Sequence, residues 1–330
     1  MPKKVIAGAL SIIALLTASV SGALAATNST GTGPDNGLRI APVRTDITIQ
    51  PGLTKEVPVY ITDETKSPVT LQVVINNFIA NGTSGIPNLI YSQSKNYNDP
   101  YGLKQFIAPI PNITLQPYKE TFVNVKISIP KTNPGGGYFA AVRFAPANIT
   151  QSKNVTLSAS VASLILVKVP GPGLKEQVSL SSFNVQDHGQ PGRFFFSSNS
   201  LQAVAAFSNT GNVQEQPFGK VEVQNMSGKV IMSKQINTGI PPGNVLPGST
   251  RIFDVKLTGL GSFGKYKVSG FFGYGTTGQL LSATTTIYVV APWIIVLIVV
   301  IILLIIGLLF LMPRLFRAWY RRSIKKAKVS

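Results

Sequence analysis

The segment Leu38–Ile75 reads LRIAPVRTDITIQPGLTKEVPVYITDETKSPVTLQVVI. After the turn signal Pro51-Gly52, apolar side chains occupy every second position, and a second alternating run follows a polar stretch. Alternation of this kind places the apolar side chains on one face of a strand, so the segment predicts strands that cover one side of a core. The alternating residues are Val57, Val59 and Ile61, followed by Val69, Leu71, Val73 and Ile75.

The strand pattern continues through the first half of the chain with one interruption. Val123–Ile129, Tyr138–Phe144 and Asn154–Val169 are predicted as further strands. Between Phe78 and Phe106 the alternation gives way to NGTSGIPNLIYSQSKNYNDPYG, a polar and aromatic stretch. A loop of this length without secondary structure is often functional, and the alternative is an insertion that contains a short hairpin.

The sequence PGPG at 170–173 separates this first set of strands from a second set. Short strands with frequent turn signals, in a chain with 30 Gly and 23 Pro, predict β-sandwiches. We therefore expect an all-β ectodomain of two tandem immunoglobulin-like β-sandwiches, at 38–169 and 174–290, joined by the linker 170–173. The second set of predicted strands is Val178–Val185, Phe194–Phe196, Gln202–Asn209, Val221–Val223, Lys229–Ile236, Arg251–Leu257, Lys265–Tyr274 and Leu280–Val290.

The N-terminus has the composition of a secretory signal peptide. Two lysines precede an apolar run, and the small-residue sequence ALA ends at Ala25. We predict a signal peptide at 1–25 that is cleaved after Ala25, with an uncleaved anchor as the alternative. Residues 26–37, rich in Thr, Asn, Ser and Gly, predict a flexible leader.

Residues 293–312 read WIIVLIVVIILLIIGLLFLM and contain no charge. A helix of this length spans roughly 30 Å, the thickness of the hydrocarbon core of a bilayer, and satisfies its own backbone there. The segment therefore predicts one C-terminal transmembrane helix, with the lipid bilayer as a partner of the chain.

The basic tail at 313–330 predicts the orientation of this helix. It contains Lys and Arg residues and no acidic residue, which is typical of the cytoplasmic side. We therefore expect a single-pass protein of the cell membrane, with its N-terminal ectodomain outside and its tail in the cytoplasm. The tail also has the composition of a segment that lies on anionic lipid. The residues expected at the membrane interfaces are Trp293, Trp319, Tyr320, Arg314 and Arg317.

The composition argues against several classes of function. The formal net charge of +18 is scattered over the chain, apart from clusters at its two ends, so nucleic acid is not an expected partner. The chain has no cysteine, which argues against a disulfide-stapled module. The one histidine, His188, stands in a turn-like context, so neither a metal site nor a serine nucleophile with a histidine base is expected. We therefore expect no enzyme activity and no cofactor.

The strand-turn-strand opening at Leu38–Ile75 and NPGGGYFAAVRF at Asn133–Phe144 resemble the peptidoglycan-binding domain of the WxL-interacting protein family. The stretches SNTGNVQEQPFGKVEV, GNVLPGSTRIFDV and FGKYKVSGFFGYGTTGQ are placed like the second, host-binding immunoglobulin-like domain of that family, before a C-terminal membrane helix. The resemblance implies a bacterial, wall-proximal adhesion or scaffolding protein. Its partners would be peptidoglycan or another cell-wall glycan, or a secreted surface protein.

Candidate ligand-binding residues lie in the polar and aromatic stretch. Tyr91, Tyr97 and Tyr101 stand among amides and positive charges, including Lys95 and Asn96. Aromatic rings beside amides suit the faces and hydroxyls of glycans, and they also suit protein interfaces. A second set of candidates, whose alternative role is ordinary strand packing, is Tyr138, Phe139 and Arg143.

Three functional hypotheses follow from these patterns. The first is a non-catalytic, membrane-anchored surface binding or adhesion protein whose outer domain docks cell-wall polymer or a secreted partner. The second is a structural or accessory subunit of a membrane or envelope assembly, in which the helix makes specific contacts. The third is an exported carbohydrate-active enzyme, which would depend on acids such as Asp63, Glu64 or Asp99.

Overall fold

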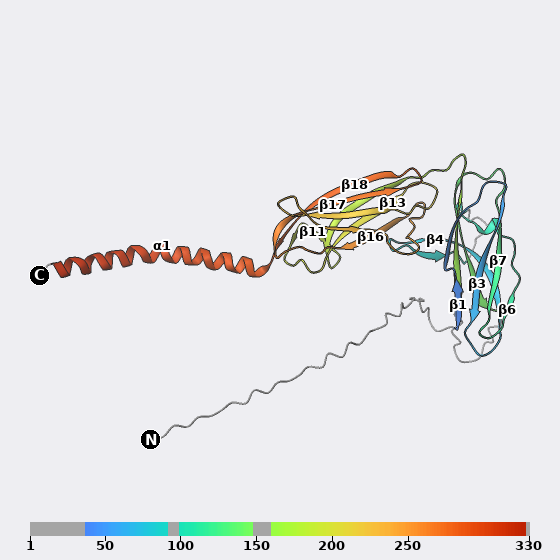
Figure 1. The fold of residues 1–330 in the computed structure, drawn as a ribbon, viewed down its shortest axis with the longest axis horizontal. Coiled ribbons are helices and arrows are strands. Elements are labelled where there is room, and N and C mark those ends of the chain that lie inside the picture. The colour runs from blue at the N-terminus through green and yellow to red at the C-terminus, as the bar shows by residue number, and fades with distance from the viewer. Residues whose placement is uncertain (1–36, 92–98, 148–159, 328–330) are drawn as a thin grey trace, which may run out of the picture. The chain divides into compact units, whose positions relative to one another are not determined.

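The computed structural model describes residues 37–91, 99–147 and 160–327. The predicted signal peptide and the predicted leader, except for Gly37, lie outside the described residues. The described chain consists of β-sheets followed by one helix, α1 (Figure 1).

Two sheets pack face to face in the first half of the chain. One has the strand order β1-β3-β7, and the other has the order β2-β9-β8-β4-β5, with β6 paired to β4. Neighbouring strands are antiparallel except for β2 and β9, which are parallel. The strands are β1 (Leu38–Ala41), β2 (Arg44–Thr48), β3 (Thr54–Asp63), β4 (Val69–Asn81), β5 (Ile86–Leu89), β6 (Ile113–Leu115), β7 (Glu120–Ser128), β8 (Gly136–Pro146) and β9 (Val161–Val169).

The core of this first sandwich is built from the alternating apolar residues. Val59 and Ile61 of β3 are fully buried, as are Val125 of β7 and Phe144 of β8. Each such side chain contributes about 1.5–3 kcal/mol through the apolar surface that it removes from water. The apolar side chains predicted at every second position therefore form the core that holds the two sheets together.

A second pair of sheets forms the other sandwich. Their strand orders are β11-β10-β13-β16 and β12-β18-β17-β14-β15. Phe207 of β13, Val221 of β14, Val268 of β17 and Ile287 of β18 meet in its core. The predicted fold class, two tandem immunoglobulin-like sandwiches before a C-terminal helix, is confirmed. The strands are β10 (Val178–Asp187), β11 (Gln190–Gly192), β12 (Phe194–Phe195), β13 (Leu201–Asn209), β14 (Phe218–Gln224), β15 (Val230–Gln235), β16 (Thr250–Lys256), β17 (Phe263–Tyr274) and β18 (Gln279–Val290).

The polar and aromatic stretch after Phe78 begins with a hairpin. β4 continues to Asn81 and turns into β5, so that Phe78 pairs with Leu89. The short hairpin of the alternative interpretation is therefore present, and a functional role of the stretch stays a prediction. Further on, the 3-10 helix η1 (Lys104–Phe106) follows a bend that returns the chain to the sheet.

The helix α1 (Pro292–Ala327) confirms the predicted C-terminal helix and is longer than predicted. Among the described residues, one helical stretch, 292–314, is long and apolar enough to cross a membrane, with a mean hydropathy of 3.8. The helix continues through Pro313, although proline lacks the N–H that would bond the preceding turn. Only Ala291 separates β18 from α1.

Candidate functional site

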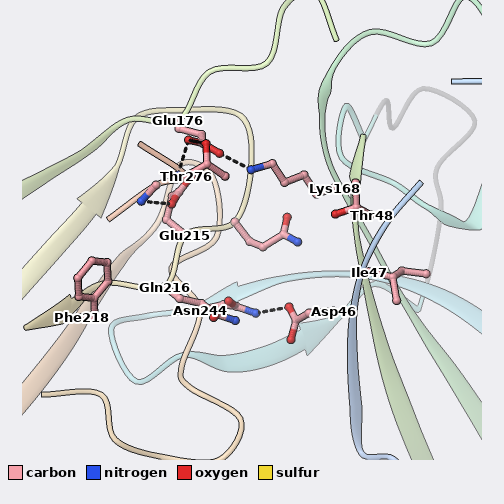
Figure 2. Close-up of a pocket in the computed structure, with 12 residues that line it drawn as sticks. Asp46, Ile47, Thr48, Lys168, Glu176, Glu215, Gln216, Phe218, Asn244 and Thr276 are labelled. Carbon is pink, nitrogen blue, oxygen red and sulfur yellow. Dashed lines mark hydrogen bonds and ion pairs between the residues drawn. The ribbon is translucent and has the colours of Figure 1, made fainter. Parts of the chain in front are cut away.

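A polar cavity of about 330 Å³ is lined by residues of both sandwiches (Figure 2). The first sandwich contributes residues of β2 together with Lys168 of β9. The second sandwich contributes Phe218 of β14 and residues from segments that connect its strands, and Glu176 comes from the segment between the two sandwiches. The lining residues are Asp46, Ile47, Thr48, Lys168, Glu176, Gln214, Glu215, Gln216, Phe218, Asn244, Gly275 and Thr276.

Glu176 joins the two sandwiches at one side of the cavity. Its carboxylate forms an ion pair with Lys168 and accepts hydrogen bonds from the Thr276 amide, at 2.9 Å, and the Thr276 hydroxyl, at 2.8 Å. Burial acts to raise the pKa of Glu176, but the hydrogen bonds from Lys168 and Thr276 outweigh it and lower the pKa. Glu176 is therefore held in its ionised form. Lys168 itself lies on β9 opposite Gly137.

Glu215 lies deeper, with only 5% of its surface exposed. One carboxylate oxygen accepts a hydrogen bond of 3.0 Å from the Gly275 amide, and Figure 2 shows the side chain close to Glu176. Burial first, and then the negative charge of Glu176, raise the pKa of Glu215 to about 7. Two carboxyl groups with separated pKa values also occur in acid–base catalysis. Here the hydrogen bonds to Gly275, Thr276 and Lys168 give the pair a structural role.

The other side of the cavity is fastened by Asp46. Its carboxylate pairs with Arg44 at 2.7 Å and accepts a 2.8 Å hydrogen bond from Asn244 of the second sandwich. Arg44 also donates to the Pro242 carbonyl at 2.6 Å. The amide oxygens of Asn244 and Gln214, two residues that line the cavity, are buried without a hydrogen-bond partner.

The glycine run of the NPGGGY motif lies where the two sandwiches touch. A Cβ at Gly135 would come within 2.6 Å of the Gly171 carbonyl, and one at Gly137 within 3.0 Å of the Val213 backbone. The Gly137 amide donates to the Asn212 carbonyl at 2.7 Å. Because glycine has no Cβ, the motif allows the backbone of the first sandwich to approach the backbones of the linker and of the second sandwich.

Asn212 acts as a clamp between the two sandwiches. Its Nδ2 donates to the carbonyls of Gly135, at 3.1 Å, and Gly173, at 2.7 Å, while its Oδ1 accepts from the Lys175 amide at 2.7 Å. One side chain therefore ties the first sandwich, the predicted linker and the second sandwich together.

Replacing Asn212 by alanine is expected to lower the free energy of unfolding by about 2–3 kcal/mol, because three hydrogen bonds of about 1 kcal/mol each are lost. The matched control is Asn225→Ala, since the Asn225 Oδ1 also accepts three hydrogen bonds, all within its own turn. Limited proteolysis at 170–173 distinguishes the two variants. Asn212→Ala should speed cleavage several-fold and Asn225→Ala should not; equal rates would contradict the clamp.

The structure separates the candidate ligand-binding residues. Tyr91 is 70% exposed, and the Arg143 guanidinium lies 5.4 Å from its ring centroid. Tyr101 is partly buried, with its ring centroid 6.3 Å from that of Phe139. Tyr138 and Phe139 are buried strand residues, as their alternative role required. The candidates Lys95, Asn96 and Tyr97 lie outside the described residues.

The predicted interface residues all lie on α1. Trp293 and Arg314 are exposed near the two ends of the apolar stretch. Arg317, Trp319 and Tyr320 belong to the same helix, and their side chains lie outside what the structure describes.

The acids considered for catalysis do not meet in one site. Asp63 is buried and accepts from the Thr65 amide, and Glu64 forms an exposed pair with Arg39 at 3.0 Å. Asp99 lies elsewhere, in the bend before η1, and burial raises the pKa of its carboxyl. Within residues 37–91, 99–147 and 160–327, no group of three His, Cys, Asp or Glu side chains is placed to hold a metal ion.

Sequence reasoning missed the residues that line the cavity between the sandwiches. Lys168 occupies an ordinary position in a strand pattern, and nothing in LILVKVP distinguishes it. Glu215 offered a weak signal, because an acid in NVQEQPFG stands between apolar residues of the second set. Their partners lie in distant parts of the chain, so only the fold brings them together.

The fold and the site define a class of protein. It has two immunoglobulin-like sandwiches with a polar cavity between them, and an apolar helix follows the second sandwich. Residues 45–145 match the family model described as WxL Interacting Protein, peptidoglycan binding domain. The resemblance to the WxL-interacting protein family is thus confirmed, over these residues. The matched segment contains Tyr91 and Arg143 and ends within β8.

Other comparisons are weaker. No curated protein matches the chain. Similar solved structures include a chaperone–tip adhesin complex of CFA/I fimbriae, with 12% identity over 76% of this chain and 98% of that chain and a TM-score of 0.38. The class 5 fimbriae chaperone CfaA is 14% identical over 76% and 98%, with a TM-score of 0.37. The E. coli chaperone DraB is 13% identical over 76% and 96%, with a TM-score of 0.31. Likeness at this level carries no inference about this chain.

Proposed function

We propose that the chain is a non-catalytic surface protein, anchored in the cell membrane by α1, whose first sandwich binds cell-wall glycan. The observation that carries the proposal is the match of residues 45–145 to a peptidoglycan-binding domain. The apolar stretch 292–314 supports the anchor, and the basic tail supports a cytoplasmic C-terminus. The N-terminal segment 1–25 is the signal peptide in this proposal.

The surface around Tyr91 is the glycan platform that we favour. Tyr91 presents an exposed ring, and Arg143 lies over it and donates to Asn76 at 3.4 Å. A flat ring beside a guanidinium donor matches a sugar, which has an apolar face and hydroxyls at its rim. Asn76 is held by a second hydrogen bond, of 3.0 Å, to the Ile90 carbonyl.

Tyr91→Ala is expected to weaken binding of the detergent-solubilised chain to purified sacculi roughly tenfold, since loss of one aromatic contact costs about 1–1.5 kcal/mol. The matched control is Phe122→Ala, another exposed aromatic of the first sandwich that lies on β7 in the opposite sheet. Co-sedimentation measures both. Absence of binding by the unaltered chain would reject the function, whereas equal effects of the two variants would reject only the platform.

A secreted protein is a second candidate partner. An apolar cavity of about 650 Å³ on the second sandwich is bordered by exposed Phe218, Phe271 and Leu280, which is unusual for a surface without a partner. Protease treatment of the sacculi before co-sedimentation separates the two candidates. Retention that survives treatment supports glycan, and retention that disappears supports a wall-associated protein.

A further inference from the structure

Exposed aromatic side chains gather at one end of the second sandwich, on the outer face of the sheet that contains β18. Phe194 is 72% exposed, Phe196 64% and Phe263 61%. The Phe194 ring stacks on Tyr288, with 4.9 Å between the centroids and 14° between the planes. We refer to Phe194, Phe196, Phe263 and Tyr288 as the aromatic edge.

Strand alternation explains why these rings face outward. Phe195, between Phe194 and Phe196, is buried in the core of the second sandwich, and so are Tyr266 and Val289. A strand sends successive side chains to opposite faces, so the neighbours of the buried residues point away from the core. The aromatic edge is therefore exposed by the pairing of the strands.

The register of the strands places the aromatic edge beside the start of α1. Phe263 pairs with Val290, and Phe194 pairs with Tyr288. The Ala291 amide donates to the Ser262 carbonyl at 2.8 Å, which fastens the chain to β17 immediately before the helix. Paired Cα atoms lie about 5 Å apart and successive ones 3.8 Å apart, so the Cα of Phe263 lies no more than about 16 Å from that of Trp293 at any angle of the helix.

At this separation the aromatic side chains can reach the polar layer of a membrane. The headgroup region adds roughly 5–8 Å on each side of the hydrocarbon core, and an aromatic side chain extends several ångströms beyond its Cα. If Trp293 stands at the boundary of the hydrocarbon, the aromatic edge reaches the headgroups without any change in the sandwich. Aromatic residues are the ones enriched at this depth.

The charge of the surrounding surface favours anionic lipid. Lys265 lies opposite Tyr288, and Lys267 lies two residues further along the same face of β17. Both lysines are exposed, and neither β12, β17 nor β18 contains an acidic residue. Lysines near an anionic membrane surface are attracted to it electrostatically.

We propose that the aromatic edge is a second membrane contact, by which the end of the second sandwich next to α1 reaches the anionic headgroups of the leaflet that α1 enters first. This inference rests on the membrane anchoring proposed above and does not depend on what the first sandwich binds. The occupant of the surface is lipid, in contrast to the apolar cavity at the other end of β18, around Leu280.

The absence of native cysteine allows the contact to be measured with one dye on the full-length chain. A fluorophore is attached at Ser197→Cys, next to the aromatic edge, or at the control position Ser282→Cys on the outer face of β18. Ser282 lies eight residues before Val290, or about 27 Å along the strand, well outside the headgroup layer. The chain is reconstituted in vesicles of phosphatidylcholine and phosphatidylglycerol.

We expect headgroup-nitroxide lipid to quench the dye at 197 several-fold more than the dye at 282, and aqueous iodide to show the reverse order. Changing Phe194, Phe196 and Phe263 together to serine should remove this difference while the chain still floats with the vesicles. Equal quenching at the two positions, or quenching that survives the triple change, would overturn the lipid contact alone. A chain that fails to float with vesicles at alkaline pH would overturn the membrane anchor and the contact together.

Discussion

Replacing Phe139 with alanine is expected to lower the free energy of unfolding by about 3–5 kcal/mol and to loosen the junction of the two sandwiches. Phe139 is 2% exposed and packs against Phe78 and Leu166 of the first sandwich, together with Leu246 of the second. Its removal leaves a cavity within the small apolar cluster that is shared by both sandwiches.

Phe144→Ala is the matched control for Phe139→Ala. Phe144 lies on the same strand and is fully buried, but its contacts belong to the core of the first sandwich alone. Native-state hydrogen exchange distinguishes the two variants at residues 243–249, where the Val245 and Gly248 amides are hydrogen-bonded to Glu215 and Asn209. Phe139→Ala should speed exchange there and Phe144→Ala should not. Unchanged exchange in Phe139→Ala would show that the cluster does not couple the sandwiches.

The second large effect is a loss of stability between about pH 4.5 and pH 7 that depends on Glu215. Its pKa rises from an ordinary 4.5 to about 7 in the folded chain, so the folded form binds the proton more tightly than the unfolded form. The stability contributed by this proton is complete below the unfolded pKa and is lost as the pH rises through the folded pKa. The loss is on the order of 3 kcal/mol, at about 1.4 kcal/mol per pH unit.

Glu215→Gln tests this linkage because glutamine keeps an acceptor for the Gly275 amide and has no proton to lose. The variant should match the unaltered chain at pH 4, below the unfolded pKa, and exceed its stability at pH 8. The control is Glu222→Gln, which removes the same charge from a pair between the partly buried Glu222 and the exposed Lys220. Urea denaturation followed by near-ultraviolet circular dichroism of the tyrosines reports the sandwiches, since Trp293 and Trp319 lie in α1. A stability curve in which Glu215→Gln keeps the original pH slope would contradict the assignment.

Local patterns in the sequence were enough to predict most strands. The alternation at Val57–Ile61 predicts a strand because side chains two residues apart share one face of a sheet. The unbroken apolar run of 293–312 predicts a membrane helix, and both patterns can be read from neighbouring residues alone. The predicted strands Tyr138–Phe144 and Lys265–Tyr274 fall within β8 and β17 for the same reason. The three-residue strands β6 and β11 are too short to give such a signal.

The candidate site could not be predicted in the same way, because it depends on contacts that are distant in the sequence. Glu176 pairs with Lys168, which is near it in the sequence, and accepts a hydrogen bond from Thr276, which lies a hundred residues later. The contact with Thr276 forms only because the sandwiches are folded and packed. The NPGGGY motif was visible, but its glycines matter because of Asn212, a residue that no local pattern distinguishes. Of the aromatic candidates, composition pointed to both Tyr91 and Tyr101 and could not show that one is exposed and the other packed.

The direct passage from β18 through Ala291 into α1 has a mechanical consequence. Tension applied to the first sandwich is transmitted along the chain into β10, which belongs to one sheet of the second sandwich. It leaves through β18, which belongs to the other sheet, so it must shear the core between the two sheets. β18 is paired along its whole length with β17, from Gln279 to Val290, so many backbone hydrogen bonds share the load at once. With one residue between strand and helix, there is no flexible linker to absorb an extension. If the first sandwich binds the wall and α1 spans the membrane, as proposed above, force on the first sandwich therefore reaches the bilayer with little extension of the chain between strand and helix.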